Sequence, residues 1–152
     1  MLKKIGTFFE CSNRKKILFI HACIVGYYAW LLDVFFQRRL RLGVESLNKI
    51  SARNLPNYSS ENSSQLVKDI GWSIKLAHKY ILVNNACRHN AYQAKIMCKK
   101  YRLDSTIYVG AKINELGEAE AHAWTVVDDY MVTGFCQAEE YLVLNTFINE
   151  IK

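Results

Sequence analysis

The sequence predicts a single α+β domain in which N-terminal helices are followed by an antiparallel sheet. Two observations lead to this fold class. Up to about residue 101, apolar residues recur at the three-and-four spacing of a helix face, whereas the segments STIYVGAKI, AHAWTVV and YMVTGF beyond Asp104 are rich in β-branched and aromatic residues. The chain has 152 residues, 51% of them hydrophobic, with one proline, which suits one core. We expect an N-terminal helical segment (1–55), a loop (56–64) and a core (65–152) in one compact domain.

Residues 17–36, ILFIHACIVGYYAWLLDVFF, are the most apolar stretch and predict a buried helix with its N-cap at Ser12 or Asn13. The stretch is just long enough to span a membrane, but His21 and Asp33 lie inside it and basic residues flank both ends. The following FFQRRLRLG is unlike a signal-peptide cleavage site. The basic flanks could contact acidic lipid or an acidic peptide, or only solvent.

The excess of positive charge belongs to the N-terminal third of the chain. Residues 1–53 hold ten basic and three acidic residues, while residues 54–152 hold ten and eleven. Such an excess suits an acidic partner and equally suits solvent. No aromatic-interleaved basic motif or recognition helix accompanies it, so nucleic-acid binding is not indicated.

Three further helices are expected between the apolar stretch and the sheet. The first covers about 40–50 and runs into an Asn- and Ser-rich loop. The second covers about 65–81, where apolar residues follow one helix face and Ser63 or Ser64 is available as N-cap. The third covers about 87–101 and again carries a buried apolar stripe.

Three strands are predicted after Asp104, in the segments STIYVGAKI, AHAWTVV and YMVTGF. The break NELGEAE separates the first strand from the second, and Asp128 with Asp129 makes a tight turn between the second and the third. Short connections of this kind join antiparallel neighbours, so the strands are expected to form a meander.

Five cysteines, with no CxxC pair, indicate a reduced, cytoplasmic chain. Cys87 begins the helix that follows NNA, so its sulfur lies near unpaired backbone N–H groups whose partial positive charge favours the thiolate, which is the nucleophilic form. Cys98, eleven residues later on the buried stripe, is expected in the core.

His122 lies on the AHAW strand, on the same face as Trp124 because side chains alternate along a strand. A Cys and a His that meet across a fold can act as nucleophile and general base, so Cys87 and His122 are candidate catalytic residues. The remaining histidines, His21, His78 and His89, are expected to be structural or exposed. The cysteines and histidines lack zinc-ligand spacing, and no phosphate-binding glycine motif occurs, so neither a metal nor another cofactor is predicted.

Several segments carry a resemblance that covers nearly the whole chain: FFECSNRKKILFIHACIVGYYAWLLDVFFQRRLRLG, NNACRHNAYQAKIMCKKYRLDSTIYVGAKI, AHAWTVVDDYMVTGF and EEYLVL. Together they resemble the stand-alone B proteins of lasso-peptide biosynthesis, members of the transglutaminase-like and papain-like cysteine peptidase superfamily. The resemblance implies a core with the nucleophile at a helix N-terminus. It also implies that Cys87 and His122 act as nucleophile and base when the leader is removed from a ribosomally made precursor.

The third catalytic position is left open by the sequence. Members of the family often carry an Asp about twelve residues after the histidine, where this chain has VTG at 132–134. Asp128 and Asp129 are turn residues that would lie about 20 Å from His122 at the rise of a strand. A backbone carbonyl or the Thr133 hydroxyl is the remaining candidate for orienting the imidazole.

The resemblance also implies partners: the precursor peptide, a separate leader-recognition protein, and an ATP-dependent lactam synthetase that acts on the freed amine. Two other functions are compatible with the residues. The same thiol could carry out acyl transfer or deamidation, because the acyl-enzyme is common to these reactions. Alternatively, the chain could be a non-enzymatic membrane-associated scaffold, anchored by residues 17–36, with Cys87 an ordinary cysteine.

Overall fold

The computed structural model describes residues 11–36, 44–46, 64–80 and 87–150, and it confirms the α+β class. Its helices are α2 (Asn13–Phe36), α3 (Gln65–Ala77) and α4 (Cys87–Lys100), with a 3₁₀ turn η2 at Ala138–Glu140. Its strands are β1 (Val44–Ser46), β2 (Ser105–Ile113), β3 (Ala119–Val127), β4 (Tyr130–Thr133) and β5 (Leu142–Asn149). All strand pairs are antiparallel and follow the order β1-β5-β2-β3-β4.

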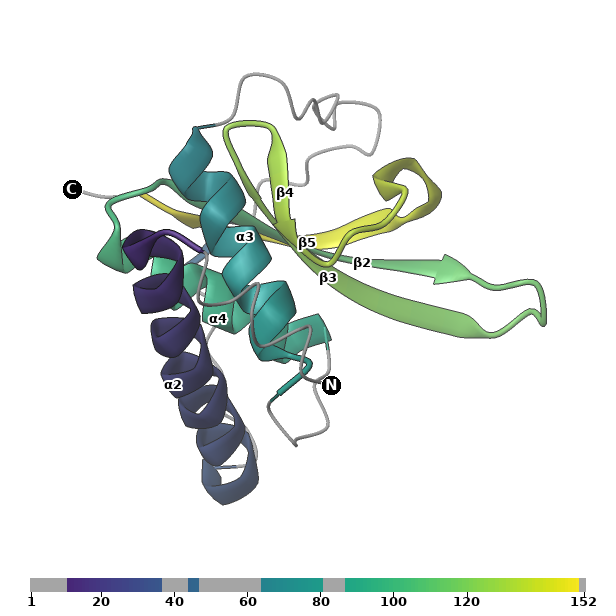
Figure 1. The fold of residues 1–152 in the computed structure, drawn as a ribbon. Coiled ribbons are helices and arrows are strands. Elements are labelled where there is room, and N and C mark those ends of the chain that lie inside the picture. Colours follow the sequence, from purple (N-terminus) through teal and green to yellow (C-terminus); the bar gives the residue numbers. More distant parts are fainter. Residues whose placement is uncertain (1–10, 37–43, 47–63, 81–86, 151–152) are drawn as a thin grey trace.

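The three helices pack together on one side of the sheet, while the β2–β3 hairpin extends away from them (Figure 1). The main core lies between the helices and β3 and β4, and consists of apolar side chains from all of these elements: Leu18, Ala22, Val67, Ile70, Ile74, Ala77, Ala94, Met97, Cys98, Val127 and Val132. The apolar stripes predicted for the helices at about 65–81 and 87–101 are therefore the faces of α3 and α4 that are buried against the sheet and α2.

Helix α2 begins where the sequence predicts, at the Ser12 cap. The Ser12 hydroxyl oxygen accepts a hydrogen bond from the Lys15 amide at 3.4 Å, which satisfies one free N–H group of the first turn. The helix is only partly buried, however. By length and composition, its residues Asn13–Leu32 could cross a membrane. Only 28% of that stretch is buried inside the protein.

The helix predicted for residues 40–50 is wrong where the structure describes it, because Val44–Ser46 form strand β1. The three residues pair with β5, with Val44 opposite Ile148 and Ser46 opposite Thr146. An open strand edge offers backbone hydrogen bonds to an extended neighbour, and this tertiary pairing outweighs local helix propensity. The rest of that segment and most of the predicted loop 56–64 lie outside the described residues.

Helices α3 and α4 agree with their predictions to within a few residues. The Ser64 hydroxyl caps α3 by accepting from the Val67 amide at 3.4 Å. The helix ends at Ala77, since the amides of Lys79 and Tyr80 bond carbonyls only three residues back; residue 81 lies outside the described residues.

The three predicted strands are confirmed as β2, β3 and β4. Asp128 and Asp129 make the turn between β3 and β4 with φ of 45° and 60°, a left-handed conformation that Asp tolerates. The strand β5 was not predicted. It lies between β1 and β2 in the sheet, next to the first strand of the predicted meander. The meander of β2, β3 and β4 is therefore only part of the sheet.

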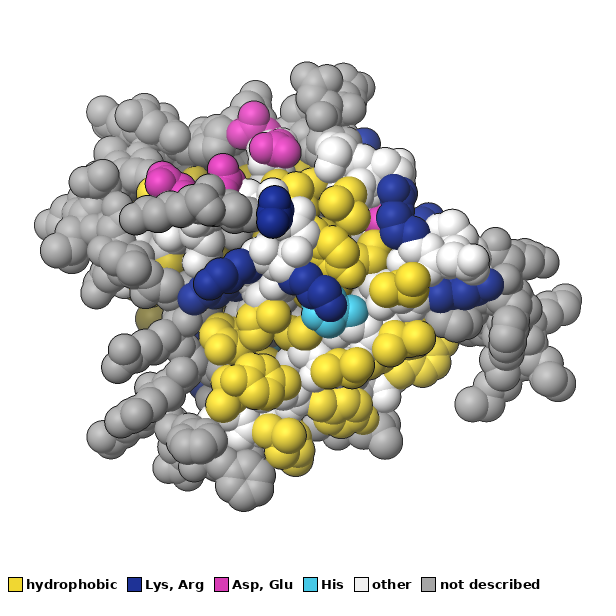
Figure 2. Space-filling view, turned by 90° about the vertical axis from the view of Figure 1, so that its left-hand side faces the viewer, with side chains coloured by type: hydrophobic (Ala, Val, Ile, Leu, Met, Phe, Trp, Pro, Cys, Tyr) yellow, Lys and Arg dark blue, Asp and Glu magenta, His cyan; other side chains and the backbone are white. Residues whose placement is uncertain are grey.

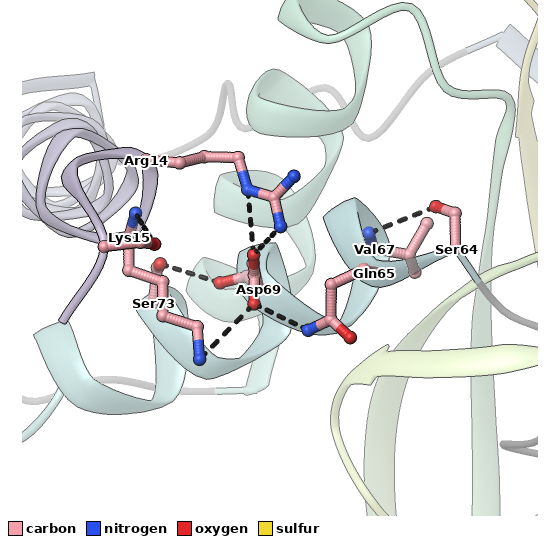
Figure 3. Close-up of polar contacts among 8 residues, drawn as sticks. Arg14, Lys15, Ser64, Gln65, Val67, Asp69 and Ser73 are labelled. Atoms are coloured by element: carbon pink, nitrogen blue, oxygen red, sulfur yellow. Dashed lines mark hydrogen bonds and ion pairs between the residues drawn. The ribbon is translucent and has the colours of Figure 1, made fainter.

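A buried carboxylate joins α2 to α3 (Figure 3). Asp69 is 2% exposed, and its oxygens accept from Arg14 Nε at 3.0 Å and from Gln65 Nε2 at 2.9 Å. The Lys15 ammonium lies 3.6 Å from the same carboxylate, and the Ser73 hydroxyl donates to the Asp69 backbone carbonyl. Every lone pair of the buried group thus has a nearby donor, which offsets the cost of burying the charge.

Hydrogen bonds of one buried side chain, Gln93, hold α4 in place. The Gln93 side chain, 1% exposed, donates from Nε2 to the Ala22 carbonyl of α2 at 2.6 Å. Its Oε1 accepts from His78 Nε2 at 3.2 Å, at the end of α3. One amide therefore connects all three helices and fixes where α4, and with it Cys87, lies against the sheet.

Candidate active site

Cys87 is the first residue of α4, as the sequence predicts. The amide N–H groups of a first helical turn have no partners within the helix, so they favour negative charge at that point. The side chain is half-buried and packs on a small apolar cluster formed by Ala91, Ile107 and Ala123. These contacts place the thiol between the helix start and the helix-covered face of the sheet.

His122 lies on β3 opposite Gly110 of β2, and its ring Nε2 is 3.1 Å from the Gly134 carbonyl oxygen. A carbonyl oxygen only accepts hydrogen bonds, so Nε2 must carry the proton. The neutral imidazole then has its lone pair on Nδ1. The hydrogen bond to Gly134 thus selects the tautomer whose Nδ1 can act as a base.

Aromatic rings fix the plane of the His122 imidazole. Its centroid lies 6.3 Å from the Trp124 ring, nearly parallel to it, and 5.5 Å from the Tyr141 ring. Gly110 leaves room for these rings, because a Cβ there would lie 3.1 Å from both Trp124 and Tyr141. The shared face of His122 and Trp124 that alternation predicts is confirmed.

Gly134 itself can only be glycine. Its φ is +71°, and a Cβ would lie 2.3 Å from the Ala123 carbonyl oxygen and 2.8 Å from Trp124 Cα. The backbone directly after β4 therefore lies close to Ala123 and Trp124 of β3, and the Gly134 carbonyl reaches His122. Of the two candidates left open for the third position, it is the backbone carbonyl that contacts the ring. The Thr133 hydroxyl is buried and has no hydrogen-bond partner among the described residues.

Cys87 and His122 belong to different side-chain clusters. Ala123, in the cluster that Cys87 joins, points to the helix-covered face of β3, while its neighbours His122 and Trp124 point to the other face. In the part of the chain that the structure describes, no hydrogen bond joins the Cys87 thiol to the His122 ring. The catalytic pairing of these two residues stays a prediction.

A pocket of about 370 Å³ lies between α3, α4 and the end of β4. Asn90, one helical turn after Cys87, lines it, and so does Gly134, which holds His122. The exposed ring of Phe135 stands at the same pocket beneath the Lys75 ammonium, 5.8 Å from the ring centroid. The pocket is therefore adjacent to the neighbours of both candidate residues.

The other described thiols are held in their neutral form where a shift is evident. Burial raises the pKa of Cys98, which is fully buried in the core as predicted, to about 12. Burial also raises the pKa of Cys136 to about 11 and that of Cys23 above its usual value. The remaining histidines are packed against neighbours: burial lowers the pKa of His21 and His78, and His89 is buried.

Sequence reasoning did not single out Gly110 or Tyr141, which shape the site. A glycine within a β-branched strand is a signal for close approach of another group, and Gly110 within YVGAKI fits it. The contact of Tyr141 depends on where β5 inserts, which only the sheet order determines.

A comparison with protein families matches residues 30–146, more than half of the chain, to the model described as the transglutaminase-like superfamily. Neither the curated proteins nor the solved structures contain a match to this chain. The matched region spans α3, α4 and the strands up to β5, including the helix that begins at Cys87 and the strand that carries His122. The chain belongs to the transglutaminase-like superfamily.

Proposed function

We propose that the protein is a cysteine peptidase that removes the leader peptide from a ribosomally made lasso-peptide precursor, with Cys87 as nucleophile and His122 as base. Membership of a superfamily that is typically cysteine-protease-like supports the reaction class. The observation that carries the residue roles is the hydrogen bond from His122 Nε2 to the Gly134 carbonyl, since it leaves Nδ1 as the basic nitrogen.

In the proposed reaction the Cys87 thiol gives its proton to His122 Nδ1, and the thiolate attacks the scissile carbonyl carbon. The C–N bond breaks, the leaving amine takes the proton from Nδ1, and the leader remains as a thioester on Cys87. Water then hydrolyses the thioester, releasing the leader carboxylate and the free thiol. Backbone N–H groups at the start of α4, that of Cys87 first, stabilise the oxyanion.

This chemistry requires the thiol and Nδ1 to come within hydrogen-bond reach in the complex with the precursor. In the structure His122 points to the face of β3 opposite the cluster that Cys87 joins, so the pairing requires a rearrangement around the start of α4. The pocket is lined by Asn90, one helical turn after Cys87, and by Gly134, the hydrogen-bond partner of His122, so we propose it as the site that receives a side chain of the precursor. We propose that this rearrangement accompanies binding of the precursor.

The proposal includes three partners and a compartment. Besides the precursor, a separate leader-recognition protein presents the leader, and an ATP-dependent lactam synthetase uses the amine that cleavage frees. The reaction takes place in the cytoplasm, where a reactive thiol stays reduced.

The test is cleavage of a precursor peptide, mixed with its leader-recognition protein, by the wild-type chain and by Cys87→Ala and His122→Ala variants. We expect either substitution to lower the cleavage rate at least about a thousandfold, because nucleophile and base act as a unit. Cys136→Ala removes another half-buried thiol and serves as the matched control, with cleavage unchanged. Full cleavage by Cys87→Ala or His122→Ala would refute the assignment.

Acyl transfer is the second candidate, because the superfamily match supports an acyltransferase-type activity as well as a peptidase. Product masses separate the two. Hydrolysis of the thioester yields two fragments of the precursor, whereas transfer to an amine yields one ligated species.

A further inference from the structure

Large apolar side chains form a continuous stripe along the outer face of α2. The stripe, called here the α2 ridge, consists of Ile17, Ile20, Ile24, Tyr27, Tyr28 and Leu31, with exposed fractions between 43% and 62%. Their spacing of three and four residues puts them on one side of the helix. The opposite side, including Leu18 and Ala22, is buried in the core, so the ridge is a second apolar face that lies outside the core formed by the described residues.

The α2 ridge is long as well as exposed. From Ile17 to Leu31 it extends about 21 Å at the rise of an α-helix. Figure 2, viewed from the side on which α2 lies, shows hydrophobic side chains gathered in a broad band on this face with Lys and Arg side chains along its upper border. Contiguous exposed patches of this kind mark surfaces that contact another apolar body.

The basic border comes in part from α4. The His21 ring packs edge-on against Tyr101 at 5.9 Å, so the end of α4 that carries Lys99 and Lys100 lies beside α2. Both lysines are exposed. One turn earlier, the Lys95 ammonium lies over the Tyr92 ring at 5.9 Å. Apolar and cationic side chains thus form one surface.

The cations of this surface act on one another. Burial lowers the pKa of Lys95, and the neighbouring Lys99 lowers it further. Burial likewise lowers the pKa of His21, and the Lys100 ammonium adds to the effect. Like charges are thus close enough to repel, and a negatively charged partner would relieve that repulsion.

We propose that the α2 ridge and its lysine border dock the protein on the surface of an anionic lipid bilayer, with α2 lying in the plane of the membrane. Three features favour a bilayer over a protein partner. The ridge follows a single helix, its apolar side chains are aliphatic or tyrosine, and ammonium groups border it, as in helices that lie at lipid interfaces. Tyrosine suits such an interface because its ring is apolar and its hydroxyl is polar.

The geometry also separates lying on a membrane from crossing it. A spanning α2 would have to leave α3 and α4, which would expose Leu18, Ala22 and their core partners and break the hydrogen bond from Gln93 to the Ala22 carbonyl. Docking through the α2 ridge keeps all of these contacts. It also leaves the β2–β3 hairpin, which points away from the helices, in solution (Figure 1).

The test is co-sedimentation of the full chain with vesicles of phosphatidylcholine alone or with about one third phosphatidylglycerol. We expect binding to the anionic vesicles. Lys99→Gln combined with Lys100→Gln should weaken it about twenty-five-fold, since each lysine near an anionic surface contributes about a factor of five. Ile17→Ser, Ile20→Ser and Ile24→Ser together should abolish it.

Matched controls separate the surface from general effects. Ile113→Ser with Leu116→Ser removes two side chains that are 69% and 83% exposed on the hairpin, and should leave vesicle binding unchanged. Lys68→Gln with Lys79→Gln removes two positive charges, as Lys99→Gln with Lys100→Gln does, but from the region of α3, and it should also leave vesicle binding unchanged. The substituted side chains are exposed or, for Lys68, half-buried, and none belongs to the core, so each variant should keep the wild-type unfolding temperature.

Two results would overturn the proposal. One is that wild-type chain fails to sediment with anionic vesicles, or sediments no less after the isoleucine substitutions. The other is concentration-dependent dimerisation, seen by light scattering, that the same substitutions abolish, which would make the α2 ridge an interface between two copies of the chain.

Discussion

The junction of α2 and α3 differs from the region around His122 in whether its buried polar groups have hydrogen-bond partners. At the junction, the Asp69 carboxylate meets Arg14, Lys15 and Gln65, and it has donors on both oxygens. Around His122, the Trp124 indole N–H and the hydroxyls of Thr125 and Thr133 are buried without a hydrogen-bond partner among the described residues. The buried polar group of the junction is thus fully hydrogen-bonded, whereas the strands of the candidate site keep unused hydrogen-bonding capacity.

The sharpest test of this contrast is Asp69→Ala. The substitution removes the buried acceptor of Arg14, Lys15 and Gln65, while the two cations, 53% and 34% exposed, can still reach water; we therefore expect a loss of about 1–3 kcal/mol. Glu140→Ala is the control: its pair with Lys112, 2.8 Å long, lies near the surface and contributes at most about 1 kcal/mol. Urea unfolding measures both. Equal losses for the two variants would mean that the buried junction is no special source of stability.

Gly134→Ala should give the next largest effect, on activity rather than on stability alone. The added Cβ would clash with the Ala123 carbonyl, displace the Gly134 carbonyl and free His122 Nε2. A misplaced base lowers turnover by about a hundredfold. Imidazole ¹⁵N chemical shifts of His122 should change from the Nε2-protonated tautomer to a mixture, which is a readout independent of cleavage.

Gly117→Ala is the matched control, because Gly117 also has a positive φ, +79°, but a Cβ there has no atom within 4 Å. The Gly117→Ala variant places an alanine at a positive φ, as Gly134→Ala does, but its Cβ clashes with no neighbouring atom. If both glycine variants lost the same activity, or if the tautomer of His122 were unchanged in Gly134→Ala, the carbonyl would have no orienting role.

Thr133→Val should have a smaller effect and the opposite sign. The substitution replaces a buried hydroxyl that lacks a partner with a methyl group of similar shape, so stability should stay the same or rise by about 1 kcal/mol. Cleavage should persist, because the Gly134 carbonyl and not this hydroxyl contacts His122. A large loss of cleavage with stability unchanged would assign the orienting role to Thr133 instead.

The smallest expected effect is a pH dependence of stability from His78. Burial lowers its pKa in the folded chain, although hydrogen bonds to Gln93 and Asn90 oppose the shift. The unfolded chain therefore binds more protons, and stability should fall as the pH drops below about 6.5, the usual pKa of histidine. Unfolding midpoints at several pH values measure the slope. In His78→Gln the slope should be shallower, and an unchanged slope would remove His78 as its source.

The parts of the fold that could be predicted are those with local signals. Helices α3 and α4 follow from apolar periodicity and the Ser64 cap, and the β3–β4 turn follows from Asp128 and Asp129. Strand β1 could not be predicted, since it exists because β5 offers it an edge. Nor could the position of β5 between β1 and β2, because strand order depends on contacts far apart in the chain.

The candidate site divides in the same way. The start of a helix at Cys87 and the strand around His122 are local, and the sequence indicates both. The group that holds the imidazole is a backbone carbonyl, which every residue carries, so no residue type could announce it. Likewise, apolarity of residues 17–36 could not distinguish a buried helix from one that buries one side and exposes the other.

Periodicity, caps and turn residues act over a few positions, and they were enough to predict the fold class, the helix that begins at Cys87, the strand of His122 and the turn after it. Long-range packing is what pairs β1 with β5, brings the Gly134 carbonyl to His122 and leaves the α2 ridge exposed. Each of these depends on which surfaces meet when distant segments pack, and that is a property of the assembled chain.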